Sequence, residues 1–185
     1  MKTKLPLVLI VLLLAVISAS SQATTQKFTP GWDNFTQPIN FTKSNVKWSV
    51  STTKTNKLIV TYTLVGATPS KLYQVALNFF CSTFPTTFGQ FPTDLGGGAC
   101  TALTRQGVTR DSAEVEVGVV LTDVHGNGAL SVVIASVPSG TYDLEFFVRD
   151  GAGCDISGGA GDGPDCAVDF QSPGPFGTGT TITVP

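Results

Sequence analysis

The stretch NVKWSVSTTKTNKLIVTYTL, residues 45–64, determines the fold class, because apolar and polar side chains alternate along two successive runs of it. The apolar residues are Val46, Trp48 and Val50 in the first run and Leu58, Val60, Tyr62 and Leu64 in the second. A period of two places every second side chain on one side of an extended chain. Each run therefore predicts a β-strand with one buried face.

The same period recurs in five further runs that are rich in Val, Thr and aromatic residues. They cover residues 73–79, 115–121, 130–134, 142–148 and 180–184, and Val115, Val117, Val119 and Leu121 are expected on one face. Turn residues separate the runs. Seven inward faces require two sheets packed together. For residues 45–185 we predict an all-β, immunoglobulin-like, two-sheet antiparallel β-sandwich of about seven strands with two disulfide-braced loops.

Residues 1–23 have the three-part plan of a secretory signal peptide. Lys2 and Lys4 give a basic start, residues 5–17 are apolar, and small residues lead to a cleavage position near Ala23. A retained membrane anchor is the alternative, but the apolar run is shorter than the roughly 20 residues that span a bilayer. We expect a secreted, extracellular protein with no stable membrane span after cleavage.

An N-terminal arm, residues 24–44, follows the predicted cleavage position. It lacks a sustained period and contains Pro30 and Pro38, so we expect either irregular chain or an edge strand broken by proline. Asn34 and Asn40 begin Asn-Phe-Thr triplets, which would accept a glycan if the host glycosylates its exported proteins.

The charge of the mature chain argues against two classes of partner. Without the signal peptide the chain keeps nine basic and thirteen acidic residues, a net charge of about −4. Lys and Arg form no cluster, so binding to nucleic acid or to an anionic membrane is not expected. The roughly 160 remaining residues suffice for one domain with its own core.

Four cysteines follow the signal peptide, and an even count in an oxidising compartment predicts disulfides. Of the three possible pairings we favour Cys81–Cys100 and Cys154–Cys166, because each closes a stretch rich in Gly and Pro. Each closure is worth on the order of 3 kcal/mol of stability in the chain-entropy model. A zinc site is disfavoured, since the cysteines are widely spaced and the chain has one His.

The stretch CSTFPTTFGQFPTDLGGGAC, residues 81–100, is the candidate binding loop. Phe84, Phe88 and Phe91 recur in it among Pro, Thr and Gly. Long loops are often functional, and rigid rings on a closed loop would anchor a protein or stack on a sugar. The alternative is that the three rings fold back and cover one end of the sandwich.

A second loop, residues 150–169, holds five Asp residues. Asp155, Asp162 and Asp165 are the candidate metal ligands, because calcium takes six to eight oxygen ligands. Their spacing matches neither the EF-hand nor the repeated GGxGxD motif. We therefore expect no cofactor and a Gly-rich loop braced by a disulfide, with a calcium site as the alternative.

No catalytic residue is predicted. His125 is the one His and lies in the turn DVHGNG, whose Gly and Asn residues suit positive φ. No Ser stands in a GxSxG context. Glu114 and Glu116, like Asp143 and Glu145, alternate with apolar residues, so we expect both pairs on a solvated sheet face and not across a glycosidase cleft.

The stretch TDVHGNGALSVVIASVPSGTYDLEFFV, residues 122–148, resembles the end of prealbumin-like and Cna-B-type bacterial extracellular sandwich repeats. The shared order is TD-x-x-G, a strand, PSGTY and an alternating strand. The resemblance implies an extracellular scaffold or stalk module without intrinsic catalysis. Some such repeats carry a Lys–Asn crosslink to the last strand, but residues 180–184, TTITV, contain neither Asn nor Asp.

The function expected from these features is that of a secreted, non-enzymatic interaction or structural module. Its partner would be an unidentified protein or a glycan. The alternative is a carbohydrate-binding or calcium-supported accessory domain. A hydrolase is the least favoured class, because positioned acid–base groups are missing from the sequence pattern.

Overall fold

The computed structural model describes residues 23–31, 37–51, 56–81, 99–105, 108–150, 167–172 and 180–185, and all regular structure in these ranges is β. The strands are β1 (Thr24–Lys27), β2 (Thr29–Pro30), β3 (Asn45–Val50), β4 (Leu58–Leu64), β5 (Leu72–Phe80), β6 (Thr101–Arg105), β7 (Val108–Leu121), β8 (Gly128–Ile134), β9 (Gly140–Asp150), β10 (Val168–Gln171) and β11 (Thr180–Val184). The seven predicted runs correspond to β3, β4, β5, β7, β8, β9 and β11. The prediction of an all-β fold is confirmed.

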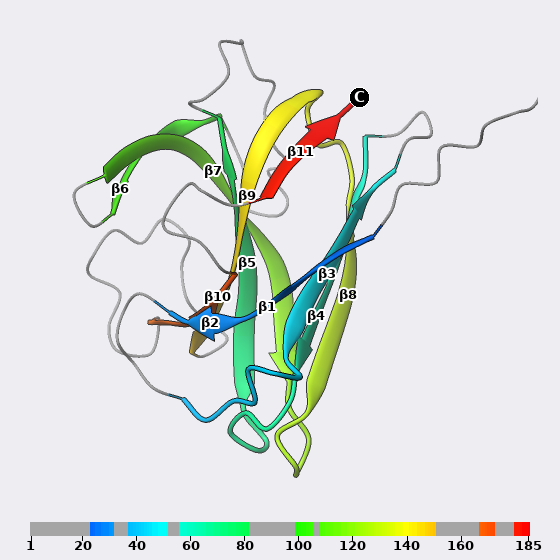
Figure 1. Cartoon of the computed structure of the whole chain (residues 1–185), viewed down its shortest axis with the longest axis vertical. Helices are drawn as coiled ribbons and strands as arrows, with labels where there is room; N and C mark the ends of the chain where they lie inside the picture. The colour runs from blue at the N-terminus through cyan, green and yellow to red at the C-terminus, as the bar shows by residue number, and fades with distance from the viewer. Residues whose placement is uncertain are drawn as a thin grey trace, which may run out of the picture.

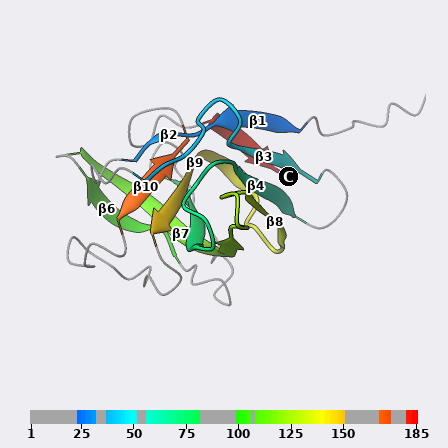
Figure 2. The same cartoon turned by 90° about the horizontal axis from the view of Figure 1, so that it is seen from below.

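Two antiparallel sheets face each other (Figures 1 and 2). The smaller sheet has four strands in the order β1-β3-β4-β8. The larger sheet has seven strands, in the order β2-β10-β9-β5-β7-β6 with β11 also paired to β9. The predicted two-sheet arrangement is therefore present, with more strands than the sequence indicated.

The N-terminal arm supplies edge strands to both sheets. β1 pairs with β3 at the border of the smaller sheet, and β2 pairs with β10 at the border of the larger sheet. Phe28 lies between them and is buried in the core. Pro30 ends β2 at a sheet edge, where proline is tolerated. Residues 24–30 of the arm thus form edge strands that end at Pro30, whereas residues 37–44 form no strand.

The core fills the space between the sheets and follows the predicted alternation. In β4 the buried residues are Leu58, Val60, Tyr62 and Leu64. Trp48 of the smaller sheet packs on Phe146 of the larger sheet, with ring centroids 4.8 Å apart. The Tyr62 hydroxyl crosses between the layers and donates to the carbonyl oxygen of Ala76 at 2.6 Å. Aromatic side chains thus join the two sheets.

A β-bulge in β7 changes one predicted face. The register with β5 shifts at Gly118, whose φ is +146°. The extra residue reverses the phase of the alternation, so Val120 is 1% exposed whereas Val119 and Leu121 are 38% and 62% exposed. The prediction that Val119 and Leu121 share one buried face with Val115 and Val117 is therefore wrong.

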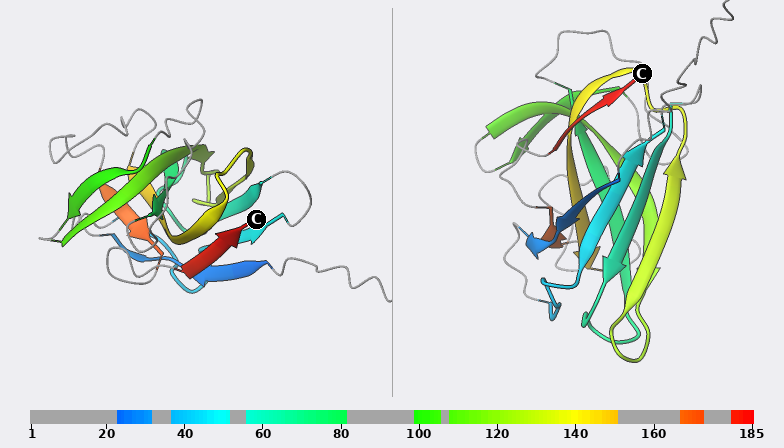
Figure 3. Two further views of the ribbon diagram at one scale, coloured as in Figure 1. Left: turned by 90° about the horizontal axis from the view of Figure 1, so that it is seen from above. Right: turned by 45° about the vertical axis from the view of Figure 1, so that its right-hand side comes forward.

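The two lateral borders of the sandwich differ. On one side β11 of the larger sheet lies beside β1 of the smaller sheet (Figures 2 and 3). There Gln26 Nε2 donates to Thr180 Oγ1 at 2.5 Å. On the other side the smaller sheet ends at β8.

Candidate functional site

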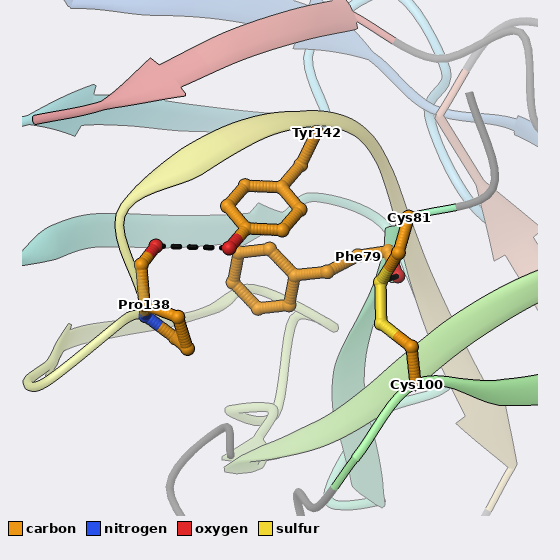
Figure 4. Close-up of a disulfide and its surroundings, with 5 residues drawn as sticks. All are labelled: Phe79, Cys81, Cys100, Pro138 and Tyr142. Carbon is orange, nitrogen blue, oxygen red and sulfur yellow. Dashed lines mark hydrogen bonds between the residues drawn. A yellow bond between two sulfur atoms is a disulfide. The ribbon is translucent and has the colours of Figure 1, made fainter. Parts of the chain in front are cut away.

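A disulfide joins Cys81, directly after β5, to Cys100, directly before β6 (Figure 4). The two Cα atoms are 6.5 Å apart. Cys81 is buried in the core, and its backbone N–H donates to the Asp111 carbonyl oxygen at 2.8 Å. The predicted Cys81–Cys100 bridge is therefore present. Cys154 and Cys166 lie outside the described residues, so their pairing stays a prediction.

Phe79 and Tyr142 belong to the same core cluster as Cys81 and are drawn with the disulfide in Figure 4. Phe79 packs edge-to-face on Tyr142, with ring centroids 5.6 Å apart. The Tyr142 hydroxyl donates to the Pro138 carbonyl oxygen at 2.9 Å, and burial raises the pKa of Tyr142 to about 12. The phenol therefore stays neutral and keeps its donor at physiological pH. Both ends of the segment between the cysteines are therefore anchored at the core, since Cys81 is buried in it and Cys100 packs against it.

Phe84, Phe88 and Phe91 belong to the stretch between these anchors and lie outside the described residues. Whether they contact a partner or cover the sandwich stays a prediction. The candidate metal ligands Asp155, Asp162 and Asp165 lie outside the described residues as well.

The outer face of the larger sheet carries a cluster of polar residues across β7, β5 and β9. Asn78 lies opposite Glu114 of β7 and opposite Glu145 of β9. Asn78 Nδ2 donates to Glu145 Oε2 at 3.2 Å. Arg149 Nη2 lies 2.7 Å from Glu114 Oε1. Gln74 Nε2 donates to Glu116 Oε1. We call these six residues the outer polar cluster: Gln74, Asn78, Glu114, Glu116, Glu145 and Arg149.

Most of the outer polar cluster is buried. Glu145 and Arg149 are 3% and 5% exposed, and Asn78 is fully buried. Phe147 lies on the same face with the Arg149 guanidinium carbon 4.9 Å from its ring centroid. The prediction that Glu114, Glu116 and Glu145 line a solvated face is therefore wrong for Glu145. The physical reason is that β5 and β9 are central strands, buried on both faces along most of their length.

The charged groups of this cluster have polar partners from neighbouring strands. A buried charge is tolerated when it is paired and hydrogen-bonded. Glu114 meets a guanidinium, and Glu116 and Glu145 each meet a side-chain amide. In the described part of the chain, no group of three or more His, Cys, Asp and Glu residues is placed to hold a metal ion. Asp143 and Glu145 formed one of the two carboxylate pairs considered from the sequence. In the structure Asp143 accepts a hydrogen bond from Thr181 Oγ1 at 2.7 Å.

His125 lies in an exposed turn, as predicted. Asp123 Oδ1 accepts hydrogen bonds from the backbone N–H groups of Asn127 at 2.9 Å and His125 at 2.8 Å. These two hydrogen bonds lower the pKa of Asp123, and the bond from Asn127 has the larger effect. The Asp123 carboxylate therefore stabilises the turn through these two backbone hydrogen bonds.

Two of the five Asp residues attributed to the second loop belong to strands. Asp150 ends β9, where its Oδ1 lies 2.5 Å from Lys71 Nζ and its Oδ2 accepts a bond from Gln37 Nε2 at 3.0 Å. Asp169 lies in β10 and is 1% exposed. Both oxygens of the Asp150 carboxylate therefore already interact with protein side chains, those of Lys71 and Gln37.

Sequence reasoning did not single out Gln74, Asn78 or Arg149. The available signal was the run LYQVALNFF, residues 72–80, which is apolar at odd and even positions alike. Such runs are typical of strands buried on both faces. Two amides in a doubly buried strand require partners, and the carboxylates of the flanking strands supply them.

Comparisons with known proteins assign no family: no family model matches the chain, and no curated protein or solved structure matches it. Among the described residues, no helix is long and apolar enough to cross a membrane.

Proposed function

We propose that this protein is a secreted, non-enzymatic interaction module that binds its partner through the segment between Cys81 and Cys100. The observation that carries the proposal is the disulfide, which fixes both ends of an aromatic-rich segment at a packed corner of the sandwich. Binding residues are commonly placed on loops that a rigid scaffold positions. Closing the loop also lowers the entropy lost when it binds.

The scaffold in this proposal is an immunoglobulin-like sandwich, and the strand order supports it. Immunoglobulin domains divide into a sheet containing neighbours A, B and E and a sheet containing C, F and G. β3, β4 and β8 are neighbours in the order of A, B and E. β5, β9 and β11 are neighbours in the order of C, F and G. The disulfide departs from the antibody pattern, because it joins β5 to the start of β6.

Tyr142 gives independent support to this scaffold. Many immunoglobulin-like domains have a tyrosine corner, in which a Tyr near the start of strand F bonds back to the backbone a few residues upstream. Tyr142 is near the start of β9, the strand in the F position, and it bonds to Pro138 four residues upstream. The sequence resemblance of residues 122–148 to extracellular sandwich repeats points to the same kind of module.

Export is supported by two features. The N-terminal residues have the pattern of a signal peptide. The Cys81–Cys100 disulfide in a small β-domain is compatible with an oxidising extracellular compartment.

The test compares two triple variants of the mature chain. The first changes Phe84, Phe88 and Phe91 to Ala. The matched control changes Leu72, Val119 and Leu121 to Ala, which are exposed apolar residues of the larger sheet. Both are measured for stability in denaturant and for binding to a glycan array and to extracellular proteins of the host.

The proposal expects the Phe variant to lose binding while its free energy of unfolding changes by about 0.5 kcal/mol per residue or less, as for surface positions. The control should bind as the unchanged chain does. A loss of about 3–5 kcal/mol for each single Phe→Ala change would instead identify buried rings, and would overturn the binding role. Binding to sugars alone would favour the carbohydrate-binding alternative.

A further inference from the structure

β8 is an edge strand of the smaller sheet, and β7 of the larger sheet lies beside its first residue, where Gly128 approaches the backbone of Leu121. All seven residues of β8 pair with β4, and in the part of the chain that the structure describes no strand pairs with its other side. Figures 1 and 3 show no other strand beyond β8 at this border. In an antiparallel ladder every second residue turns its N–H and C=O away from the partner strand. β8 therefore presents a row of backbone donors and acceptors.

This edge lacks the features that normally prevent strand addition. Proteins protect sheet edges with charged residues, Pro, bulges or short strands. The β8 sequence GALSVVI, residues 128–134, has no charge and no Pro, and its register with β4 is unbroken. The opposite edge strand of the same sheet, β1, has four residues and carries Lys27. The edge strand β2 of the larger sheet ends on Pro30.

Apolar surface gathers at the same edge. Leu130 and Val132 pack against the core but are only partly buried. On the outer face, Val133 is 51% exposed and Ile59, its register partner on β4, is 40% exposed. These two are the exposed large apolar residues of the described part of the smaller sheet. A strand added beyond β8 would cover Leu130, Val132 and Val133 from the side.

We propose that the occupant of this edge is β8 of a second copy of the chain, paired antiparallel about a two-fold axis at Ser131. In this register Ala129 of each copy faces Val133 of the other, and Leu130 faces Val132. On the outer face the small side chain of Ala129 would pack against the branched side chain of Val133. On the core side Leu130 would pack against Val132. The strand is uncharged, so no like charges meet. Two four-stranded sheets become one continuous sheet.

The contact is small, since it rests on a single seven-residue strand from each copy. Interfaces that bury less than about 1,200 Å² are characteristic of weak association. The dimer is therefore reversible and depends on concentration. It does not involve the segment between Cys81 and Cys100, so its failure would leave the proposed binding function unaffected.

The first experiment places a cysteine on the two-fold axis. In Ser131→Cys the facing Cα atoms would lie about 4.5–5.5 Å apart, within the range that a disulfide bridges. Thr63→Cys is the control, because Thr63 is on the same outer face but on the interior strand β4. After mild oxidation of the mature protein we expect about tenfold more covalent dimer from Ser131→Cys than from Thr63→Cys, reflecting the high local concentration in a preformed pair.

The register is tested with Ala129→Cys and Val133→Cys. Each variant alone should remain monomeric on non-reducing gels, and an equimolar mixture should give the covalent pair. Sedimentation of the unchanged chain should show a dimer that increases with concentration, and Val133→Lys should abolish it while retaining the native circular dichroism spectrum. A monomer at every concentration, or equal crosslinking of Ser131→Cys and Thr63→Cys, would overturn the proposal.

Discussion

The outer faces of the two sheets both carry polar residues, yet on the larger sheet the polar residues at the centre of the face are buried, whereas those on the smaller sheet are exposed. On the larger sheet Asn78, Glu145 and Arg149 are at most 5% exposed. On the smaller sheet Lys47 and Ser131 are exposed, and Ser131 shares a hydrogen bond of 2.9 Å with Thr61. The period-two pattern identifies which side chains share a face. It does not determine whether water reaches that face.

The largest expected effect tests the burial of charge on the larger sheet. Arg149→Met keeps most of the side-chain volume but removes the cation that lies 2.7 Å from Glu114. Breaking one partner of a buried ion pair costs about 3–5 kcal/mol, because the other charge is left uncompensated. Unfolding in urea should show this loss. Lys47→Met, on the outer face of the smaller sheet, is the control and should change stability by about 0.5 kcal/mol or less. Equal effects would remove the distinction between the faces.

A smaller effect is expected at the centre of the outer polar cluster. Asn78→Leu removes the amide that donates to Glu145 Oε2. A hydrogen bond to a charged group contributes about 1.5–3 kcal/mol, so the free energy of unfolding should fall by about that amount. The matched change on the smaller sheet is Thr61→Val, which removes an exposed hydrogen bond to Ser131. It should cost a few tenths of a kcal/mol. A neutral Asn78→Leu would show that Glu145 does not depend on this amide.

Tyr142→Phe tests the hydrogen bond between Tyr142 and Pro138. The change removes the hydroxyl that donates to Pro138 but leaves the ring packed on Phe79. A net loss of about 1 kcal/mol is expected for one hydrogen bond. Thermal unfolding measures it, and Tyr142→Leu, which also removes the ring contact, should cost more. If the two variants were equally stable, the ring would contribute nothing at this position.

The strands that alternate strictly were predictable from the sequence. β3, β4 and β8 of the smaller sheet each have one face in the core, so periodicity alone locates them. The Cys81–Cys100 pairing followed from local loop closure in an oxidising compartment. These features depend on residues close in sequence.

Features set by tertiary neighbours were not predictable in the same way. The bulge at Gly118 placed Val119 and Leu121 on the outer face. Gly118 was the available signal, because a glycine inside an alternating run often marks a bulge. The burial of Glu145 depends on β5 and β9 having neighbours on both sides. β2 and β10 have two and four residues and pair with each other near the edge of the larger sheet. Neither strand is long enough to show a detectable alternation of apolar and polar residues.

The smallest expected effect concerns Asp123, an exposed carboxylate in the turn that connects the two sheets. Hydrogen bonds from the backbone N–H groups of Asn127 and His125 lower its pKa from the usual 3.8. A lowered pKa in the folded state means that Asp123 adds stability above pH 3.8, and that this contribution is lost as the pH falls through the lowered value. Asp123→Asn should therefore lower the melting temperature slightly at neutral pH, and the difference from the unchanged chain should shrink in strong acid. A constant difference across this pH range would show that the charge of Asp123 is not what stabilises the turn.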